Sequence, residues 1–168
     1  MKTFKSEILQ TVGKVFLLNL TASKIFLPQR RKATKMHKED FKPLSAAEEE
    51  TGKLIVNAAY VVHKALGPGL LEKVYEVCFC HVLAKDGCII KRQLDIPIMF
   101  DNIIFSEGLR LDVLVNDLVI CELKALETVN PVWQAQILSH LKLTGKRLGY
   151  LINFNVPLIK DGIKRIIL

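Results

Sequence analysis

In the stretch LRLDVLVNDLVICELK, residues 109–124, the charged residues of both strands fall on alternate positions, on a face shared with Leu114, Leu118 and Ile120, on either side of the turn signal Asn116-Asp117. Alternate residues of a strand share one face of a sheet, so this stretch predicts a β-hairpin. One face of the hairpin is wholly apolar and consists of Leu109, Leu111, Val113, Val115, Val119, Cys121 and Leu123. The opposite face gathers the charged side chains of the two strands: Arg110, Asp112, Glu122 and Lys124.

The pairing register of this hairpin decides whether the two faces stay separate. A two-residue turn sets Asp112 opposite Cys121 and mixes polar with apolar side chains. A three-residue loop over residues 116–118 sets Asp112 opposite Glu122 instead. Because a slip of one residue moves every side chain to the other face, burial of the apolar face selects the second register.

Two carboxylates that face each other across neighbouring strands repel unless a cation lies between them. Mg²⁺ takes oxygen ligands from one or two carboxylates and keeps positions for water and phosphate. Lys124, on the same face as Glu122, can position or deprotonate a water, or stabilise charge on a phosphate. The alternative is that Glu122 and Lys124 are solvent-facing residues of an edge strand, because Glu-x-Lys alone is a weak signal.

Two helices are expected before the hairpin. Apolar residues recur at helical spacing in a first helix, which begins near Ser45 or Thr51 and ends at Gly67. A second helix is expected over about residues 70–85, closed by Gly87. Its apolar stripe consists of Leu71, Val74, Val77 or Cys78, and Val82.

Short segments of β pattern occupy the rest of the chain. The expected strands span residues 88–100, 103–105, 109–115, 118–124, 147–154 and 164–168. Further turns are expected at Asp101-Asn102, Glu107-Gly108 and Asp161-Gly162. Pro97 marks an edge strand or a break, and a helix from Asn130-Pro131 to Thr144, capped by Gly145, follows the hairpin. This order predicts an α/β fold with a mixed central sheet flanked by helices.

Residues 1–45 differ in composition from residues 46–168, which are expected to form the domain. Residues 1–38 hold nine Lys or Arg and one acid, Glu7, whereas the rest of the chain is nearly neutral although the net charge is +7. Three interpretations stay open: a basic tail, a targeting segment, or upstream sequence before a true start at Met36. Any nucleic-acid surface on the domain must therefore be a local patch.

The sequence also limits the compartment and rules out some kinds of site. Its cysteines, Cys78, Cys80, Cys88 and Cys121, form no Cys-x-x-Cys pair and no zinc spacing with histidine. Free, buried thiols in a reducing cytoplasm are the expectation. No apolar run approaches the about 20 residues of a membrane span, so no membrane partner is expected.

The charged hairpin face resembles the site of the PD-(D/E)XK nuclease superfamily, which has an Asp on one strand and Glu-x-Lys on the next. In addition, Gly69-Leu-Leu-Glu72-Lys-Val-Tyr75 matches the Gly-x-x-Glu-x-x-Tyr signature of the GxxExxY family. The resemblance covers about residues 51–168. It implies a restriction-endonuclease-like fold and hydrolysis of phosphodiester bonds in nucleic acid with Mg²⁺, or with Mn²⁺ in its place.

The resemblance also implies a metal site. Asp112 and Glu122 would hold the ion, with the backbone carbonyl of Leu123 as a further ligand. Glu72 would approach the same ion from the second helix. Independently of the resemblance, Tyr75 is expected to pack between that helix and the sheet.

Further roles concern the substrate. The resemblance makes Lys124 the catalytic lysine, makes Gln136 the residue that orients phosphate or water, and lets Arg110 contact phosphate. The family's Gln-x-x-x-Tyr helix motif reads Gln136-Ile-Leu-Ser-His140 here. Gln136 and His140 share a helical face, where His140 can bind substrate or, alternatively, be a partly buried structural histidine.

Three hypotheses follow from the sequence. The first is a Mg²⁺-dependent nuclease acting on DNA or RNA without strong sequence specificity. The second is a nuclease-like domain that binds nucleic acid or protein without cutting. The third is an interaction protein with a vestigial carboxylate pair. The sequence leaves open whether the substrate is DNA or RNA, whether cleavage is internal or at an end, and which oligomeric state the protein adopts.

Overall fold

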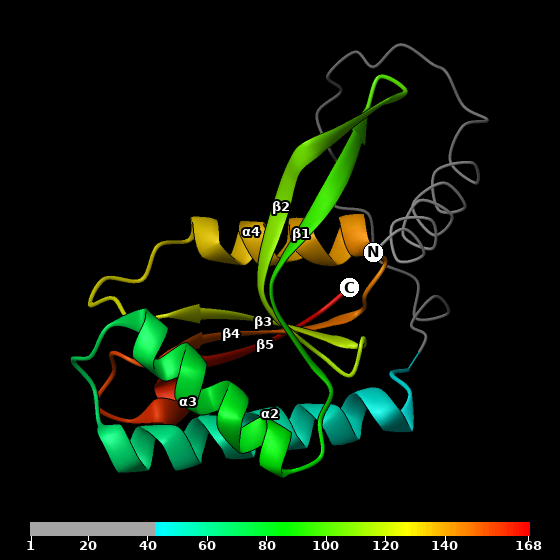
Figure 1. Ribbon diagram of the computed structural model, residues 1–168. Helices are drawn as coiled ribbons and strands as arrows, with labels where there is room; N and C mark the ends of the chain where they lie inside the picture. The colour runs from blue at the N-terminus through cyan, green and yellow to red at the C-terminus, as the bar shows by residue number, and fades with distance from the viewer. Residues whose placement is uncertain (1–42) are drawn as a thin grey trace, which may run out of the picture. The chain divides into compact units, whose positions relative to one another are not determined.

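The computed structural model describes residues 43–168, so the expectations for residues 1–42 lie outside the described part of the chain. The chain divides into two compact units, of which the second is Leu44–Leu168. In this unit a five-stranded sheet has helices α2 and α3 against one face and α4 against the other (Figure 1). The expected α/β architecture, a mixed sheet between helices, is confirmed.

The strands lie side by side in chain order. They are β1 (Ile90–Phe100), β2 (Ile103–Val115), β3 (Val119–Lys124), β4 (Leu148–Asn153) and β5 (Ile163–Ile167). All neighbours are antiparallel except β3 and β4, which are parallel. Parallel strands need a crossover connection, and α4 (Val132–Thr144) supplies it. This crossover lays α4 over the charged face of the hairpin.

Local sequence signals set the helix ends. Helix α2 (Ala46–Leu66) begins at Ser45, whose side chain and backbone exchange hydrogen bonds with Glu48 in a capping box, and it ends at Gly67 with φ of 67°. Before α4, the side chain of Asn130 accepts a hydrogen bond from the Val132 amide at 2.9 Å. The left-handed Gly145 ends α4. These ends were expected from the sequence.

Two local expectations for the strands and turns were wrong. Residues 103–115 form one continuous strand, β2, where two strands and a turn at Glu107-Gly108 were expected. A Cβ at Gly108 would collide with the backbone carbonyl of Ile96 on β1, so the glycine admits a close approach between strands. The β1–β2 register shifts there, around Pro97, as the break signal indicated. In addition, Asp161-Gly162 belongs to a short helix, α5 (Ile159–Gly162).

The hairpin register is the one that separates its faces. Val113 pairs with Cys121 and Val115 with Val119, across a loop over residues 116–118. The same register, extended by one residue, sets Asp112 across from Glu122. The register prediction is therefore confirmed.

Helix α3 (Glu72–Lys85) buries a stripe adjacent to the one expected from the sequence, one residue further along, and Cys78 and Val82 of the expected stripe pack only partly against the core. The core-facing residues are Tyr75, Phe79, Cys80 and Leu83. Three residues of the expected stripe are exposed: Leu71, Val74 and Val77. Both stripes are apolar, and Phe154 decides between them, because Tyr75 stacks on its ring at 4.7 Å and Phe79 meets the ring edge-on at 6.3 Å.

The charged face of the hairpin is also covered. Leu114 and Ile120 lie on this face and pack in one cluster with Leu141 of α4. Farther along β3, Glu122 is only 1% exposed. The alternative of a solvent-facing Glu-x-Lys on an edge strand is therefore wrong: β3 is the central strand of the sheet.

The cysteines are free thiols, as expected. Cys80 and Cys121 are buried, and Cys78 and Cys88 are partly buried. Burial raises the pKa of Cys80 to about 11, so this thiol stays protonated at neutral pH and is a poor nucleophile.

Candidate functional site

Strands β2 and β3 bring Asp112, Glu122 and Lys124 together. The Lys124 Nζ lies 2.7 Å from Glu122 Oε1 and 3.8 Å from Asp112 Oδ2. Asp112 is also held by the backbone, because its Oδ2 accepts a hydrogen bond from the Leu123 amide at 2.9 Å. The pair of carboxylates thus shares one ammonium group at the covered end of the hairpin.

Helix α4 completes the surroundings of Glu122. Gln136 donates a hydrogen bond from Nε2 to Glu122 Oε1 at 2.8 Å, so this oxygen receives both Gln136 and Lys124. Glu122 Oε2 and His140 Nδ1 are buried and have no hydrogen-bond partner, although they lie 3.6 Å apart. The other carboxylate oxygen of a buried glutamate is therefore left without a donor.

Burial and mutual repulsion perturb the titration of this cluster. Burial, followed by the charge of Asp112, raises the pKa of Glu122. Burial opposes the charged form of Lys124, yet its hydrogen bond to Glu122 and the nearby carboxylates raise its pKa. Burial lowers the pKa of His140. At neutral pH the arrangement therefore favours a charged Lys124 beside a neutral His140.

Glu72, the first residue of α3, belongs to the same electrostatic neighbourhood. Burial raises its pKa, the charge of Lys124 lowers it, and the charge of Asp112 raises it. The backbone of Ala125, just after β3, has a smaller lowering effect on this pKa. The start of α3 thus lies near the end of β3.

The remaining expected residues occupy different positions around the cluster. Arg110 is exposed on β2 and pairs across the sheet with Asp95 of β1. Leu123 buries its side chain in the core, so only its backbone is available to the site. His140 is buried and faces Glu122, which places it behind this carboxylate.

Tyr75 holds the entry to α3 in place. Its hydroxyl donates to the Gly67 carbonyl at 2.7 Å and accepts from the Leu70 amide at 3.1 Å. The ring lies against Phe154, between α3 and the sheet, as expected from the sequence. The tyrosine therefore fixes the loop that precedes Glu72.

Sequence reasoning missed two buried polar residues that support the site. Asn153, at the end of β4, bonds the amide and the carbonyl of Leu126 and so fixes the chain that leaves β3 after Lys124. Glu76 binds Arg92 at 2.7 Å and Gln93 at 2.9 Å, which ties α3 to β1. Nothing local marks either residue, because each partner is distant in sequence.

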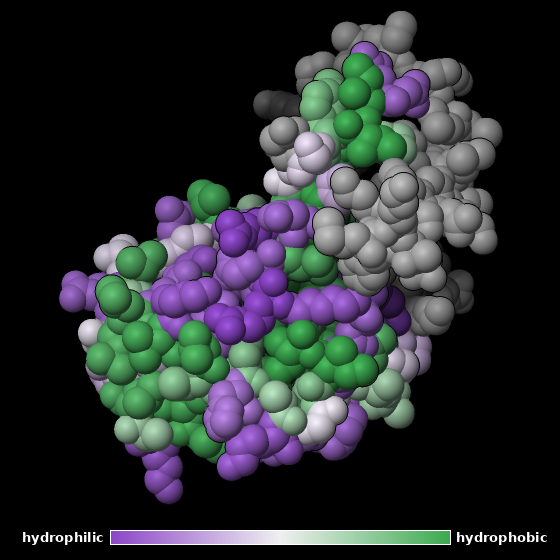
Figure 2. All heavy atoms as spheres, viewed as in Figure 1, coloured by the Kyte–Doolittle hydropathy of each residue, from purple (hydrophilic) through white to green (hydrophobic). Residues whose placement is uncertain are grey.

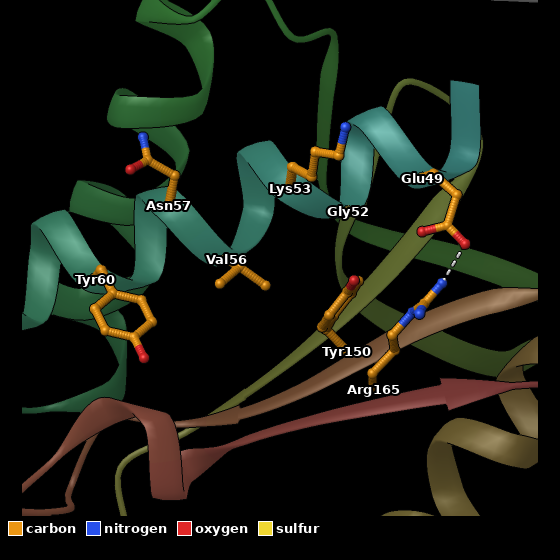
Figure 3. Close-up of a pocket in the computed structure, with 8 residues that line it drawn as sticks. All are labelled: Glu49, Gly52, Lys53, Val56, Asn57, Tyr60, Tyr150 and Arg165. Carbon is orange, nitrogen blue, oxygen red and sulfur yellow. Dashed lines mark hydrogen bonds and ion pairs between the residues drawn. The ribbon is translucent and has the colours of Figure 1, made fainter. Parts of the chain in front are cut away.

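An open hollow of about 490 Å³ lies elsewhere, between α2 and the strands β4 and β5 (Figure 3). Its charged groups are already paired, since Arg165 binds Glu49 at 2.6 Å and Lys53 binds Glu50 at 3.0 Å. The hollow also contains Tyr150, whose hydroxyl lies where a side chain at Gly52 would fall. Gly52 therefore serves close packing of α2 on the sheet.

Within residues 43–168, no three His, Cys, Asp or Glu side chains converge closely enough to hold a metal ion by themselves. No helix in the same range is both long enough and apolar enough to cross a membrane.

Comparison with known proteins gives one match. The sequence model of a family described as the PD-(D/E)XK nuclease superfamily matches residues 49–166. This range includes all the site residues described above. No curated protein and no solved structure matches the chain.

Proposed function

The chain belongs to the PD-(D/E)XK nuclease superfamily, and we propose that it hydrolyses phosphodiester bonds of nucleic acid with Mg²⁺. Within the superfamily we assign it to the GxxExxY family, on the basis of Gly69, Glu72 and Tyr75. The Tyr75 hydrogen bonds to the loop before α3 support this motif as a structural unit that places Glu72. We place the activity in the cytoplasm, since free buried thiols suit a reducing compartment.

One observation carries the proposal: Asp112 and Glu122 lie next to each other on β2 and β3, with Lys124 between them. The repulsion between these carboxylates is a cost to the fold. Purely structural positions would not need a buried glutamate with one oxygen unpartnered. The arrangement is easier to understand if a cation and a phosphate complete it.

The donor set fits a hard divalent ion. Asp112 and Glu122 supply carboxylate oxygens, and Glu122 Oε2 is free of hydrogen bonds. Because Mg²⁺ is usually bound by one or two protein carboxylates and keeps several waters, a third protein side chain is not required. Mn²⁺ accepts the same ligands. Leu123 would contribute its carbonyl, and Glu72 would act through a water. When bound, the ion would lower the pKa of an attacking water and balance charge on the phosphate.

The other catalytic and substrate-binding roles belong to side chains around the two carboxylates. Lys124, whose raised pKa keeps it protonated, stabilises negative charge on the phosphate and positions the attacking water. Gln136 holds Glu122 Oε1 and orients water or phosphate. Arg110 is exposed two residues from Asp112, where it can contact a neighbouring phosphate. His140 lies behind Glu122 and acts on substrate only through that carboxylate.

The substrate is DNA or RNA, bound without strong sequence specificity. The domain that carries the site is nearly neutral, so only a local patch attracts phosphate. Sequence-specific readers need side chains that reach base edges in a groove. Besides Lys124 and Gln136 at the reacting phosphate, the described site offers Arg110, which would contact a neighbouring phosphate and not a base.

A second candidate is a nuclease-like domain that binds nucleic acid or protein without cutting. One observation favours it: Lys124 already neutralises Glu122 at 2.7 Å, and this carboxylate is almost completely buried. Such a cluster can persist as an internal ion pair. Metal-dependent cleavage distinguishes the two candidates.

The test is a cleavage assay on labelled single- and double-stranded DNA and RNA, with Mg²⁺, Mn²⁺ or a chelator. Asp112→Ala should abolish cleavage, because it removes one of two metal ligands. Lys124→Ala should retain metal binding but lose rate by about a hundredfold or more. The matched control is Asp86→Ala, an exposed acid that follows α3, which should cleave like the wild type.

Calorimetric titration with Mn²⁺ accompanies the assay. Metal binding lost in Asp112→Ala and kept in Lys124→Ala supports the assigned roles. Wild-type protein that binds metal but cuts none of the four substrates, with both variants indistinguishable from it, overturns the nuclease proposal in favour of the binding module.

A further inference from the structure

Strands β1 and β2 extend beyond the sheet as an isolated two-stranded ribbon. We call residues 95–109 the arm; β3 pairs with β2 only over residues 113–115, well after the arm ends. Figure 1 shows the arm leaving the domain on the side away from α2 and α3. Ribbons of two strands are marginally stable in water without a further layer.

The arm is apolar and acidic. Its exposed large apolar residues are Phe100, Ile103, Ile104 and Phe105, and Phe100 is exposed by 72%. Figure 2 shows this apolar surface at the end of the arm. Residues 95–109 include three acidic residues and no Lys or Arg, and Arg110, which pairs with Asp95, lies at the base of the arm. Beyond this base the arm carries no cation that would attract phosphate, and its apolar surface is of the kind that protein partners cover.

A second apolar surface lies between α2 and α3. We call it the helix groove, a hollow of about 300 Å³ with an almost wholly apolar lining. Lining residues include Val61, Ala65 and Leu66 of α2 and Val77, Cys78 and Val82 of α3. It is bordered by the exposed stripe of α3 that the sequence predicted to be buried. Apolar side chains of α2 and α3 thus lack a covering element within the described domain.

The helix groove differs from the arm in charge. Lys64 follows Val61 by three residues and Lys85 follows Val82 by three, so each lysine lies beside the lining on its helix. The exposed Asp86 follows Val82 by four, so the surroundings of the lining carry two lysines and one acid. Both lysines are exposed, and within residues 43–168 neither has an ion pair or hydrogen bond. His81 lines the hollow itself, and no acidic residue does. An acidic, apolar partner therefore fits this surface.

We propose that the arm of one copy of this chain docks into the helix groove of a second copy. Both surfaces are apolar, and their charges are opposite, which favours this pairing over others. Two arms or two grooves facing each other would bring like charges together. Nucleic acid fits neither, because one surface is acidic and both are apolar.

The docking is between molecules and not within one. The arm points away from α2 and α3, so it does not reach the groove of its own domain (Figure 1). Each copy therefore offers one arm and one groove to others. Reciprocal contacts close a dimer, whereas one-way contacts build longer assemblies.

Sedimentation velocity of the full chain tests the docking. Wild-type protein should self-associate at protein concentrations up to about 200 μM, a high concentration because small interfaces are weak. Ile103→Ser in the arm and Val77→Asp in the groove should each raise the dissociation constant about tenfold or more. The matched control is Leu158→Ser, because Leu158 is 55% exposed and Ile103 is 56% exposed. All variants alter exposed side chains, and thermal unfolding verifies that each is folded.

A mixing experiment identifies the pairing. Ile103→Ser keeps an intact groove and Val77→Asp keeps an intact arm, so the two variants together should form mixed complexes that neither forms alone. Wild-type protein that stays monomeric to about 200 μM overturns the proposal. So does loss of association in only one of the two variants, because arm-to-arm contact is sensitive to Ile103→Ser alone and groove-to-groove contact to Val77→Asp alone.

Discussion

The carboxylate of Glu122 is buried beside a second carboxylate, and both facts act on its pKa. Burial, then the charge of Asp112, raises this pKa above the ordinary value of 4.5. The folded protein therefore binds the proton more tightly than the unfolded chain does. The stability that the raised pKa of Glu122 contributes is fully present below about pH 4.5 and is lost as the pH rises through the raised pKa.

Asp112→Asn should reduce this loss, because it removes the repelling charge while keeping an acceptor for the Leu123 amide. We expect metal-free Asp112→Asn to match or exceed the wild type in stability near neutral pH, by up to about 1 kcal/mol. Urea unfolding in a chelator between about pH 4 and 8 measures this. A steeper loss of stability with pH in the variant would contradict the repulsion.

At Gln136, removal of a donor should have the opposite effect. Gln136→Ala leaves Glu122 Oε1 with Lys124 as its remaining partner. Because a buried acceptor loses a hydrogen bond, we expect a loss of about 1–3 kcal/mol at neutral pH. Gln134→Ala, an exposed glutamine on the same helix, is the control and should change stability little. Equal effects of the two substitutions would argue against the role of Gln136 beneath Glu122.

The connection between α2 and α3 depends on one hydroxyl group. Tyr75→Phe keeps the ring stacked on Phe154 but removes both hydrogen bonds to the loop over Gly67–Leu70. The expected loss is about 1–2 kcal/mol, measured by chemical unfolding. Tyr60→Phe changes a half-exposed tyrosine on α2 and should lie within about 0.5 kcal/mol of the wild type. An unchanged Tyr75→Phe would mean that packing alone holds this loop.

The arm depends on a glycine for its strand pairing. Gly108→Ala places a Cβ against the Ile96 carbonyl, so one strand must shift. We expect a lower melting temperature and a loss of about 1–3 kcal/mol, since overpacking forces backbone movement. Ser106→Ala, an exposed residue of the same strand, should be neutral. A neutral Gly108→Ala would show that the arm shifts at no cost.

For the whole molecule, residues 1–45 differ in composition from the rest of the chain, and the matched family range is residues 49–166. Removing residues 1–35, which leaves Met36 as the start, should therefore change the melting temperature very little. Removal through Ser45 should lower stability by about 1–2 kcal/mol, because it takes the α2 cap and its capping box. A large drop on the shorter deletion would show that the N-terminal segment contributes to the fold.

The sequence alone determined the features that depend on neighbours along the chain. The segregation of the charged residues on one face of residues 109–124 fixed the hairpin register, because a slip of one residue would have set Asp112 opposite Cys121. Ser45, Gly67 and Gly145 fixed helix ends, because caps act within one turn. These signals predicted the pair of carboxylates, Asp112 and Glu122, and the lysine beside them, Lys124.

Only the tertiary structure decided which surfaces were buried. Helix α3 has two apolar stripes, and the ring of Phe154, 79 residues beyond Tyr75 in sequence, selected one of them. Likewise, the crossover between the parallel strands β3 and β4 placed α4 over Glu122 and gave it Gln136 and His140 as neighbours. Periodicity gives the faces of an element, whereas burial depends on which distant element packs against each face.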